Sequence, residues 1–261
     1  MTYETILYNC ENGVATITLN RPDSLNAFNN QMIAETQDAF KQVGRDTAAR
    51  CIVITGSGRA FSSGQDLKDV QSRGGAFSIG EHLRHGYNKL ITQMVNLEKP
   101  ILAGVNGIAA GAGCGVALAA DLRIASEKAS FMLAFSRVGL IPDSGSTWTL
   151  PRLIGYSRAY EMAITADRIS ADKAYSWGMV NEVVPHDQLP EVVSAWANTL
   201  ATGPTLAYGL TKRAMRKADG QTLEEALAYE SQLQEIAGRS HDSAEGVRAF
   251  IEKRDPEFKG E

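Results

Sequence analysis

Two glycine-rich segments are the first features of the sequence that could bind a ligand. Residues 58–67 read GRAFSSGQDL and residues 105–115 read VNGIAAGAGCG, and each segment follows an apolar run typical of a buried strand. Glycine and other small residues let ligand atoms approach the backbone closely, and the N-terminus of a helix presents N–H groups that lack partners. The two segments therefore predict a site built from main-chain groups.

The second segment matches neither of the common nucleotide-binding motifs. Gly111 and Gly113 supply the first two glycines of a dinucleotide-binding fingerprint, but Val116 stands where the third is required. No Gly-Lys-Ser/Thr follows, as a P-loop would need. A helix rich in Gly and Ala is also typical of a close-packed core, so this segment alone leaves both interpretations open.

Asp143 is a carboxyl residue with two possible roles. It stands in the run PDSG, where an Asp is commonly a turn residue or the N-cap of the next helix. A carboxyl group buried among neighbours such as Ile141 and Trp148 would instead have a raised pKa, which suits proton transfer near neutral pH. The local sequence is compatible with both roles.

The composition is that of an ordinary globular enzyme. A length of 261 residues, with 44% hydrophobic and 21% charged residues, suits one large domain or one domain with a small appendage. The net charge of −4 argues against a broad surface for nucleic acid or anionic membranes. No basic region followed by an apolar stretch opens the chain, and the apolar-rich stretch 100–120 contains Asn106, so we expect a cytoplasmic protein without a membrane span.

The cysteines and histidines give no sign of a metal site. Cys10, Cys51 and Cys114 form no Cys-x-x-Cys pair, and an odd count among apolar neighbours suits buried thiols in a reducing compartment. His82 and His85 lie three residues apart on a predicted helix, but no third ligand accompanies them. We expect no bound metal.

Strands and helices alternate in the first two thirds of the chain, which predicts repeated βαβ units. Residues 5–8 and 14–19 flank a turn and predict a hairpin, and a helix is expected over 30–43. The continuous apolar runs 51–55 and 101–105 predict strands covered on both faces. Further helices are expected over 78–97, 107–120, 189–202, 205–217 and 222–254, the last broken near Gly238, and further strands over 122–125, 129–135 and 179–184.

Several segments resemble motifs of the enoyl-CoA hydratase/isomerase (crotonase) family. Residues 55–67 resemble its "G…AF-x-x-G-x-D-hydrophobic" segment, and residues 99–113 resemble its "KP…A-x-x-G-x-x-x-G-x-G" segment. The match continues in the same order nearly to the end of the chain. The other matching stretches are residues 120–125, 139–142, 150–155, 171–180 and 245–254.

The resemblance implies an α/β fold, a spiral of ββα repeats with a C-terminal helical region that forms a homotrimer or a dimer of trimers. The spiral core would span residues 1–195 and the helical region residues 196–261. The substrate would be an acyl-CoA, whose thioester oxygen accepts hydrogen bonds from the backbone N–H groups of Gln65 and Ala112. Coenzyme A is then part of the substrate, so no further cofactor, nucleic acid or membrane partner is expected. The side chain of Gln65 would be free to vary.

The resemblance also assigns positions that contact coenzyme A. Asp66 is equally compatible with capping the next turn, Tyr87 with a core position, and Phe250 and Lys253 with a solvated face. The acyl pocket would be lined by residues 78–87. The assigned contacts are Ser24, Asn26 and Ala27 for the pantetheine and nucleotide, Ala60, Ser63, Asp66 and Leu67 near the adenine, Gln65 for the thioester, Tyr87 for the acyl group, and Phe250 and Lys253 for a phosphate, from this or a neighbouring subunit.

The number of carboxylates favours one reaction of the family. Its hydratases use two glutamates, at the positions of Gly115 and Phe135 here, and neither residue can transfer a proton. Several isomerase branches use an aspartate at the position of Asp143. The resemblance therefore implies an isomerase that shifts a double bond or rearranges a ring epoxide, with Asp143 moving one proton while two N–H groups hold the enolate.

A finer similarity, over residues 134–145 and 237–240, is to a branch that rearranges ring epoxides of aromatic acyl-CoA esters. Two alternatives stay open. One is a hydratase that works with a single acid/base, and the other is a crotonase-like subunit without catalytic activity.

Overall fold

The computed structural model describes residues 3–72 and 78–261 of the chain, and its strands form two sheets. The larger sheet has six strands in the order β1-β2-β3-β5-β7-β10, and the smaller has four in the order β4-β6-β8-β9. The larger sheet comprises β1 (Ile6–Glu11), β2 (Val14–Leu19), β3 (Cys51–Gly56), β5 (Ile101–Val105), β7 (Leu122–Ser126) and β10 (Glu182–Val184). The smaller comprises β4 (Ala60–Ser62), β6 (Ile108–Ala110), β8 (Ser130–Met132) and β9 (Ile169–Ser170).

The predicted hairpin is confirmed. Strands β1 and β2 pair antiparallel around Asn12 and Gly13, whose φ angles of 51° and 80° are those that a tight two-residue hairpin turn requires. From β2 onward, each pair of neighbours in the larger sheet is parallel.

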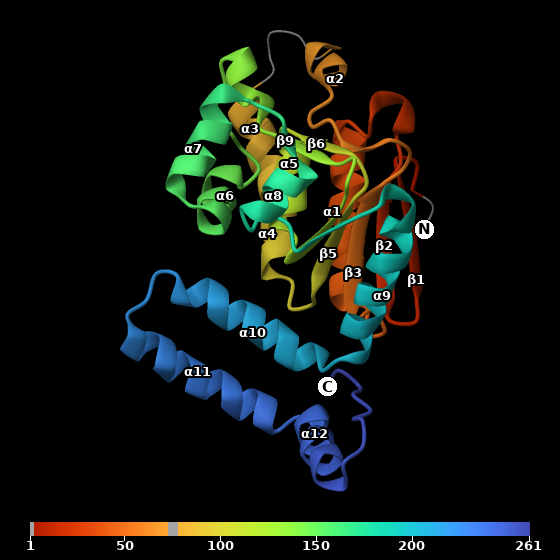
Figure 1. Ribbon diagram of the computed structural model, residues 1–261, viewed down its shortest axis with the longest axis vertical. Coiled ribbons are helices and arrows are strands. Elements are labelled where there is room, and N and C mark those ends of the chain that lie inside the picture. Colours follow the sequence, from red (N-terminus) through yellow and green to blue (C-terminus); the bar gives the residue numbers. More distant parts are fainter. Residues whose placement is uncertain (1–2, 73–77) are drawn as a thin grey trace.

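The chain repeats one unit, in which a strand of the larger sheet is followed by a strand of the smaller sheet and then by helix. β3 leads to β4, β5 leads to β6, and β7 leads to β8. The pairs β4–β6 and β6–β8 are also parallel, so each unit lies beside the previous one in both sheets. This arrangement is the predicted spiral of ββα repeats (Figure 1).

Helices cover both faces of the larger sheet, which explains its continuous apolar strands. On β3, Ile52 and Ile54 face the main core, whereas Cys51 and Val53 face helix α9. The helices of the body are α1 (Asn30–Arg45), α2 (Leu67–Ser72), α3 (Ile79–His85), α4 (Tyr87–Asn96), α5 (Ala112–Ala119), α6 (Ser146–Ile154), α7 (Tyr156–Thr165), α8 (Ala171–Ser176) and α9 (Leu189–Thr202).

The last three helices leave the body and form an arm below it (Figure 1). They are α10 (Thr205–Ala218), α11 (Leu223–Gly238) and α12 (His241–Glu252), close to the three helices expected for this region. The predicted boundary between residues 195 and 196 falls inside α9, which packs on the larger sheet, and α10 is the first helix of the arm. The division into domains stays a prediction.

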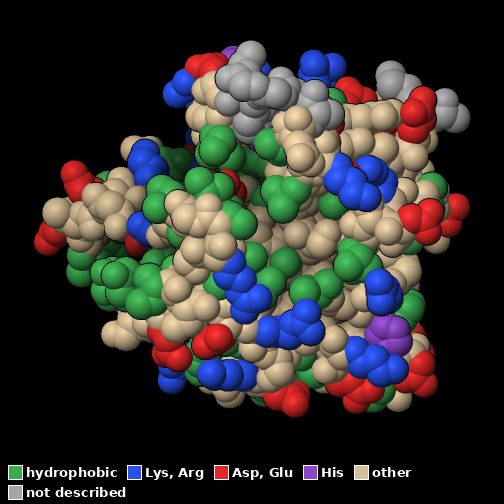
Figure 2. All heavy atoms as spheres, turned by 90° about the horizontal axis from the view of Figure 1, so that it is seen from above, with side chains coloured by type: hydrophobic (Ala, Val, Ile, Leu, Met, Phe, Trp, Pro, Cys, Tyr) green, Lys and Arg blue, Asp and Glu red, His purple; other side chains and the backbone are tan. Residues whose placement is uncertain are grey.

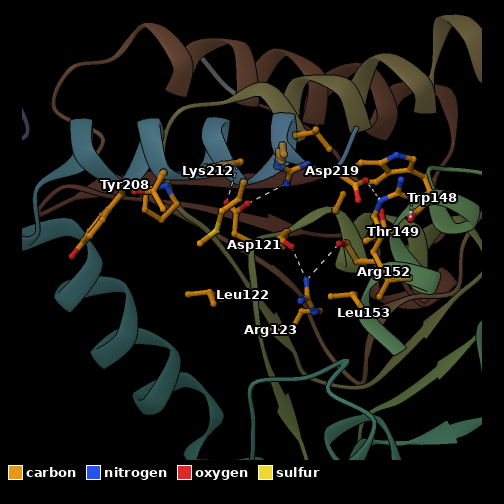
Figure 3. Close-up of a pocket in the computed structure, with 18 residues that line it drawn as sticks. Asp121, Leu122, Arg123, Trp148, Thr149, Arg152, Leu153, Tyr208, Lys212 and Asp219 are labelled. Carbon is orange, nitrogen blue, oxygen red and sulfur yellow. Dashed lines mark hydrogen bonds and ion pairs between the residues drawn. The ribbon is translucent and has the colours of Figure 1, made fainter. Parts of the chain in front are cut away.

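Asp121 links the arm to the body through hydrogen bonds and ion pairs. Its carboxylate accepts hydrogen bonds from Lys212 at 2.8 Å and Arg216 at 3.2 Å, both on α10, and from the N–H of Ile101 at 2.9 Å. Figure 3 shows Asp121 beside Lys212, with Arg123 nearby. The buried guanidinium of Arg123 donates to main-chain carbonyls. The arm is therefore held by charges rather than by an apolar seam alone.

Three expectations about secondary structure were wrong in part. The single helix expected over 78–97 is two helices, because the chain turns at Gly86, where φ is −100° and ψ is −101°. The helix expected from residue 107 starts only at Ala112, because the preceding residues pair as β6 with two other strands. Strand β9 lies in a region where no strand was expected, and it is set by pairing with β8. Within the described ranges, no helix has the length and apolar character needed to cross a membrane.

Candidate active site

The two glycine-rich segments meet at Gly64. A Cβ atom placed on Gly64 would lie 2.7 Å from the carbonyl oxygen of Ala110 and 3.3 Å from the nitrogen of Ala112, and its φ of +92° is one that glycine favours. Only a glycine lets the loop after β4 come this close to the start of α5. The contact puts the peptide group of Gln65 beside that of Ala112.

The orientation of both peptide groups is fixed by bonds to their carbonyls. The carbonyl of Gly64 accepts from the N–H of Phe28 at 2.7 Å, so the N–H of Gln65, on the opposite side of the same trans peptide, points away from Phe28. The carbonyl of Gly111 accepts from Gly115 at 3.1 Å along α5, so the N–H of Ala112 points out of the helix start. Two backbone donors next to each other, one at a helix N-terminus, suit a developing negative charge.

Asp143 lies in the turn before α6 and is half-buried. Its carboxylate accepts a hydrogen bond from the hydroxyl of Ser144 at 2.7 Å, and its carbonyl accepts from the N–H of Ser146 at 2.9 Å. Burial raises the pKa of the Asp143 carboxyl above its ordinary value, while the bond from Ser144 acts in the opposite direction. The expected direction of the pKa shift is thus the one found.

Gly115 allows the turn at Asp143 to pack closely against α5. A Cβ on Gly115 would lie 2.6 Å from the Cβ and 2.7 Å from the carbonyl oxygen of Ser144. Gly115 is three residues after Ala112, about 4.5 Å along the helix axis. The Asp143 turn therefore sits one helical turn from the Ala112 amide, and the space of a side chain at Gly115 is filled.

Phe135 covers the other side of the helix start. Its ring lies 3.9 Å from the position that a Cβ on Gly111 would take, and the residue is buried. The second position at which family hydratases carry a glutamate is therefore an apolar wall.

The predicted contacts near the first hairpin act within the protein. Asn26 is fully buried, and its amide donates to the carbonyls of Ser57 and Ala60 and accepts from the N–H of Arg21. Its side chain therefore ties three loops together and has no donor left for a ligand. Ser24 accepts at its carbonyl from the hydroxyl of Ser63 at 3.2 Å, and Ala27 is buried beside them.

The predicted contacts after β4 have varied environments. Ala60 is buried in the strand, and Leu67 is exposed at the start of α2. Asp66 pairs with Arg21 at 2.9 Å and caps α2 by accepting from the N–H of Lys68 at 3.1 Å. Burial acts to raise the pKa of Asp66, but Arg21 and the N–H groups of the next turn outweigh it and hold the pKa low. Asp66 therefore caps α2, as one of the two interpretations expected, and it also forms an ion pair with Arg21.

Tyr87 and Gln65 lie together, whereas two other predicted residues lie far from them. Tyr87 is almost completely buried, and its hydroxyl donates to the side-chain oxygen of Gln65 at 2.9 Å. Phe250 and Lys253 are exposed on α12, at the opposite end of the molecule from α2 (Figure 1). Within one chain the structure does not bring them to the Gln65–Ala112 amides.

Arg21 and Ser144 were not identified as site residues from the sequence. Arg21 joins the first loop to the loop after β4 through Asp66 and the carbonyl of Ala27, and no local pattern around it indicates that role. The position of Ser144 could have indicated its role, because a hydroxyl next to a candidate carboxylate in the sequence can donate a hydrogen bond to it.

A cavity of about 860 Å³ lies elsewhere, between the body and α10 (Figure 3). It is bounded by the end of α5, by the Asp121 network and by Trp148 and Arg152 of α6, and it includes no residue of the loop at Gly64. Its size reflects the seam between arm and body, so we place the chemistry at the Gln65–Ala112 amides instead.

Comparison with known proteins identifies the family of the chain. The chain matches the family model for enoyl-CoA hydratase/isomerase over residues 9–261. It is 46% identical over 259 residues to the 1,2-epoxyphenylacetyl-CoA isomerase of Escherichia coli (strain K12), covering 98% of this chain and 99% of that protein. A Rhodobacter capsulatus protein named "Probable enoyl-CoA hydratase" is 45% identical over 260 residues, covering 100% of both. The solved structure of enoyl-CoA hydratase from Bacillus anthracis superposes with a TM-score of 0.90 at 36% identity, over 99% of this chain and 100% of that one.

The chain therefore belongs to the enoyl-CoA hydratase/isomerase (crotonase) family of enzymes. The family resemblance, the fold class and the similarity to a ring-epoxide isomerase are confirmed.

The close approach at Gly115 generates a first test. We expect Gly115→Ala to lower the free energy of unfolding by about 1–3 kcal/mol, because the added methyl overlaps Ser144. Displacement of the neighbouring Asp143 should also reduce turnover of acyl-CoA substrates. Urea unfolding followed by circular dichroism measures the first effect, and steady-state kinetics the second. Gly238→Ala is the matched control, since a Cβ there meets nothing within 4 Å. Equal behaviour of the two variants would contradict the packing described.

Proposed function

We propose that the chain is an acyl-CoA isomerase that shifts a double bond, or rearranges a ring epoxide, through a thioester enolate. The backbone N–H groups of Gln65 and Ala112 hold the enolate oxygen, and Asp143 is the single acid/base. One observation carries the proposal: the turn that bears Asp143, a half-buried residue whose carboxyl has a raised pKa, packs through Ser144 on Gly115, one helical turn from the Ala112 amide.

The mechanism follows from where charge develops. Asp143 takes a proton from Cα of a 3-enoyl-CoA, and the electron pair of that C–H bond forms an enolate with its charge on the thioester oxygen. The same proton then returns at Cγ as the double bond moves from C3=C4 to C2=C3. The reverse reaction starts with the Cγ proton of a 2-enoyl-CoA. Each fixed donor to such an oxygen is worth about 3–4 kcal/mol in the transition state. A positioned acid/base adds about 10²–10⁴ in rate.

One carboxyl group suits this shuttle better than hydration. Adding water across a double bond needs one group to activate water and another to handle the second proton. The two positions that supply glutamates in family hydratases hold Gly115, filled by Ser144, and the ring of Phe135. Because one relative is named as a probable enoyl-CoA hydratase, hydration stays the alternative activity.

Coenzyme A binding is proposed at the loops around Gly64. Seen from above (Figure 2), apolar side chains gather on this face, with Lys and Arg side chains beside them, a surface that suits an acyl thioester with an anionic tail. Of the proposed contacts, Ser24, Asn26 and Ala27 lie between β2 and α1, Ala60 lies in β4, and Ser63, Asp66 and Leu67 lie between β4 and the start of α2.

The Asp143→Asn variant tests the acid/base role. We expect at least a 10²-fold loss of kcat with a 3-enoyl-CoA and with an aromatic ring-epoxide CoA ester, because the amide cannot accept the proton. The raised pKa means that the buried carboxylate costs stability as pH rises, so the variant should unfold no more easily than wild type at pH 7. Coupled product assays measure kcat, and thermal unfolding measures the stability of the variant.

Asp167→Asn on the surface is the matched control and should keep full activity. Hydration of crotonyl-CoA by wild type, faster than isomerisation, would replace the isomerase proposal with the hydratase alternative. An unchanged rate in Asp143→Asn would favour a subunit without catalytic activity.

The pH profile tests the cause of the pKa shift. As pH falls through the raised pKa of Asp143, the base becomes protonated, so kcat/KM should fall at a pH above that of an ordinary aspartate. Ser144→Ala removes the bond that lowers the pKa, so the acid limb should move to still higher pH. Ser146→Ala is the control, because its buried hydroxyl makes no hydrogen bond within the described residues. An acid limb that stays in place in Ser144→Ala would contradict this assignment.

We also propose that the arm assembles the chain into a homotrimer or a dimer of trimers. Two of its helices expose large apolar side chains, among them Leu223 at 70% on α11, and Phe250 at 85% and Ile251 at 73% on α12. Apolar exposure of this extent on two successive helices is typical of a surface covered by another subunit. A neighbour could then bring Phe250 and Lys253 to a coenzyme A phosphate.

Replacing Phe250→Ser together with Ile251→Ser should shift the molecular mass toward that of the monomer, because apolar area is lost from the interface. Light scattering after size-exclusion chromatography measures the mass. Leu7→Ser, an exposed apolar residue on β1, is the control and should leave the mass unchanged. A monomeric wild type would refute the assembly.

A further inference from the structure

The side chain of Gln65 is held at both of its polar atoms, although only its backbone was expected to matter. Its amide nitrogen donates to the carbonyl of Phe28 at 3.1 Å. Its oxygen accepts from the hydroxyl of Tyr87 at 2.9 Å and lies 2.8 Å from Nε2 of His82. Since an amide oxygen only accepts, Nε2 of His82 carries a proton in this contact.

These partners come from separate elements that pack on one another. Phe28 precedes α1, His82 lies in α3, and Tyr87 begins α4. The ring of Tyr87 meets Phe28 edge-on at 5.9 Å between centroids and His82 edge-on at 5.7 Å. Phe28 and Tyr87 are buried, so the cluster forms a rigid wall behind Gln65.

The cluster bears on the orientation of one peptide. The N–H of Phe28 donates to the carbonyl of Gly64, and the carbonyl of Phe28 accepts from the N–H of Asp66. These two bonds lie on either side of Gln65. The preceding glycine is conformationally permissive, so these bonds alone leave the direction of the Gln65 side chain undetermined. Tyr87 and His82 fix that direction, which adds a further restraint on Gln65 to the two bonds that Phe28 makes on either side of it.

We propose that Tyr87 and His82 are positioning residues for the enolate: they hold the side chain of Gln65 so that its backbone N–H stays aimed at the thioester oxygen. This inference rests on the proposed function. It also couples the α3–α4 segment, where the acyl group is expected to lie, to the oxygen-binding amide. Small misplacements of a group that stabilises a transition state can cost up to about a hundredfold in rate.

Tyr87→Phe and Gln65→Ala test the proposal, because both keep the Gln65 backbone N–H and remove the anchor. With a short substrate, but-3-enoyl-CoA, we expect kcat to fall about tenfold to a hundredfold while KM changes less than threefold. The near-ultraviolet absorbance of acetoacetyl-CoA, which rises when its enolate is bound, should fall in both variants. Thermal unfolding confirms that each variant is folded.

His82 is tested by two replacements. His82→Gln, which can present an N–H where Nε2 stood, should recover most of the kcat and enolate absorbance lost in His82→Ala. Tyr3→Phe removes another half-buried hydroxyl, bonded to Asp38 at 2.9 Å, and His85→Ala removes an exposed neighbour on α3. Both controls should behave as wild type.

The outcomes separate this inference from the proposed function. Asp143→Asn should lose turnover but retain the enolate absorbance, because the amides are intact. If wild type gives no enolate signal, the enolate mechanism itself is wrong. If wild type gives the signal and Tyr87→Phe and His82→Ala keep it with unchanged kcat, the positioning role is overturned alone. A rise in KM without loss of kcat would likewise overturn it, since the residues would then only shape the acyl pocket.

Discussion

The site depends on one contact between main chains, that of Gly64 with Ala110 and Ala112. Because the gap at that point is smaller than a methyl group, the loop after β4 and the start of α5 can meet only through glycine. Everything proposed for the chemistry follows from it: two peptide groups from different ββα turns lie side by side, and their carbonyls are already engaged. The parallel pairing of β4 with β6 sets the same two turns in register.

A second constraint places the carboxyl group. The turn at Asp143 reaches α5 because Gly115 leaves room for Ser144, so the space that a glutamate side chain would need is used to bring in a different acid. Partial burial then raises the pKa of Asp143, which adjusts it toward accepting and returning a proton. In this fold, the location of the acid and its basicity have the same structural origin.

The sequence predicted much of the fold, for physical reasons that differ between elements. Helix α9 was expected over 189–202 and occupies those residues, since its apolar period and length determine it locally. Strands β6 and β9 were missed, because elements of two or three residues exist only through their partner strands. The break at Gly86 was missed because one glycine inside an apolar period is a weak local signal.

The site was predictable in its backbone and less so in its side chains. The Gln65 and Ala112 positions of the proposed site come from the family resemblance. The anchors of Gln65 do not, because Tyr87 and His82 lie 22 and 17 residues away and meet it only after α3 and α4 pack. The sequence likewise could not predict that both N–H groups of the Asn26 amide are hydrogen-bonded, since they donate to the main-chain carbonyls of Ser57 and Ala60 on another segment.

Helix α5 has eight residues, all buried, and its two ends face different parts of the molecule. Its first residue presents the Ala112 amide, while Leu118 and Ala119 at the other end line the seam against the arm. The two ends are about 12 Å apart. Because a close-packed helix surrounded on every side cannot shift at one end alone, a displacement of the arm at this seam would move the Ala112 amide as well. The position of the arm and the geometry of the proposed site are thus mechanically coupled through one short helix.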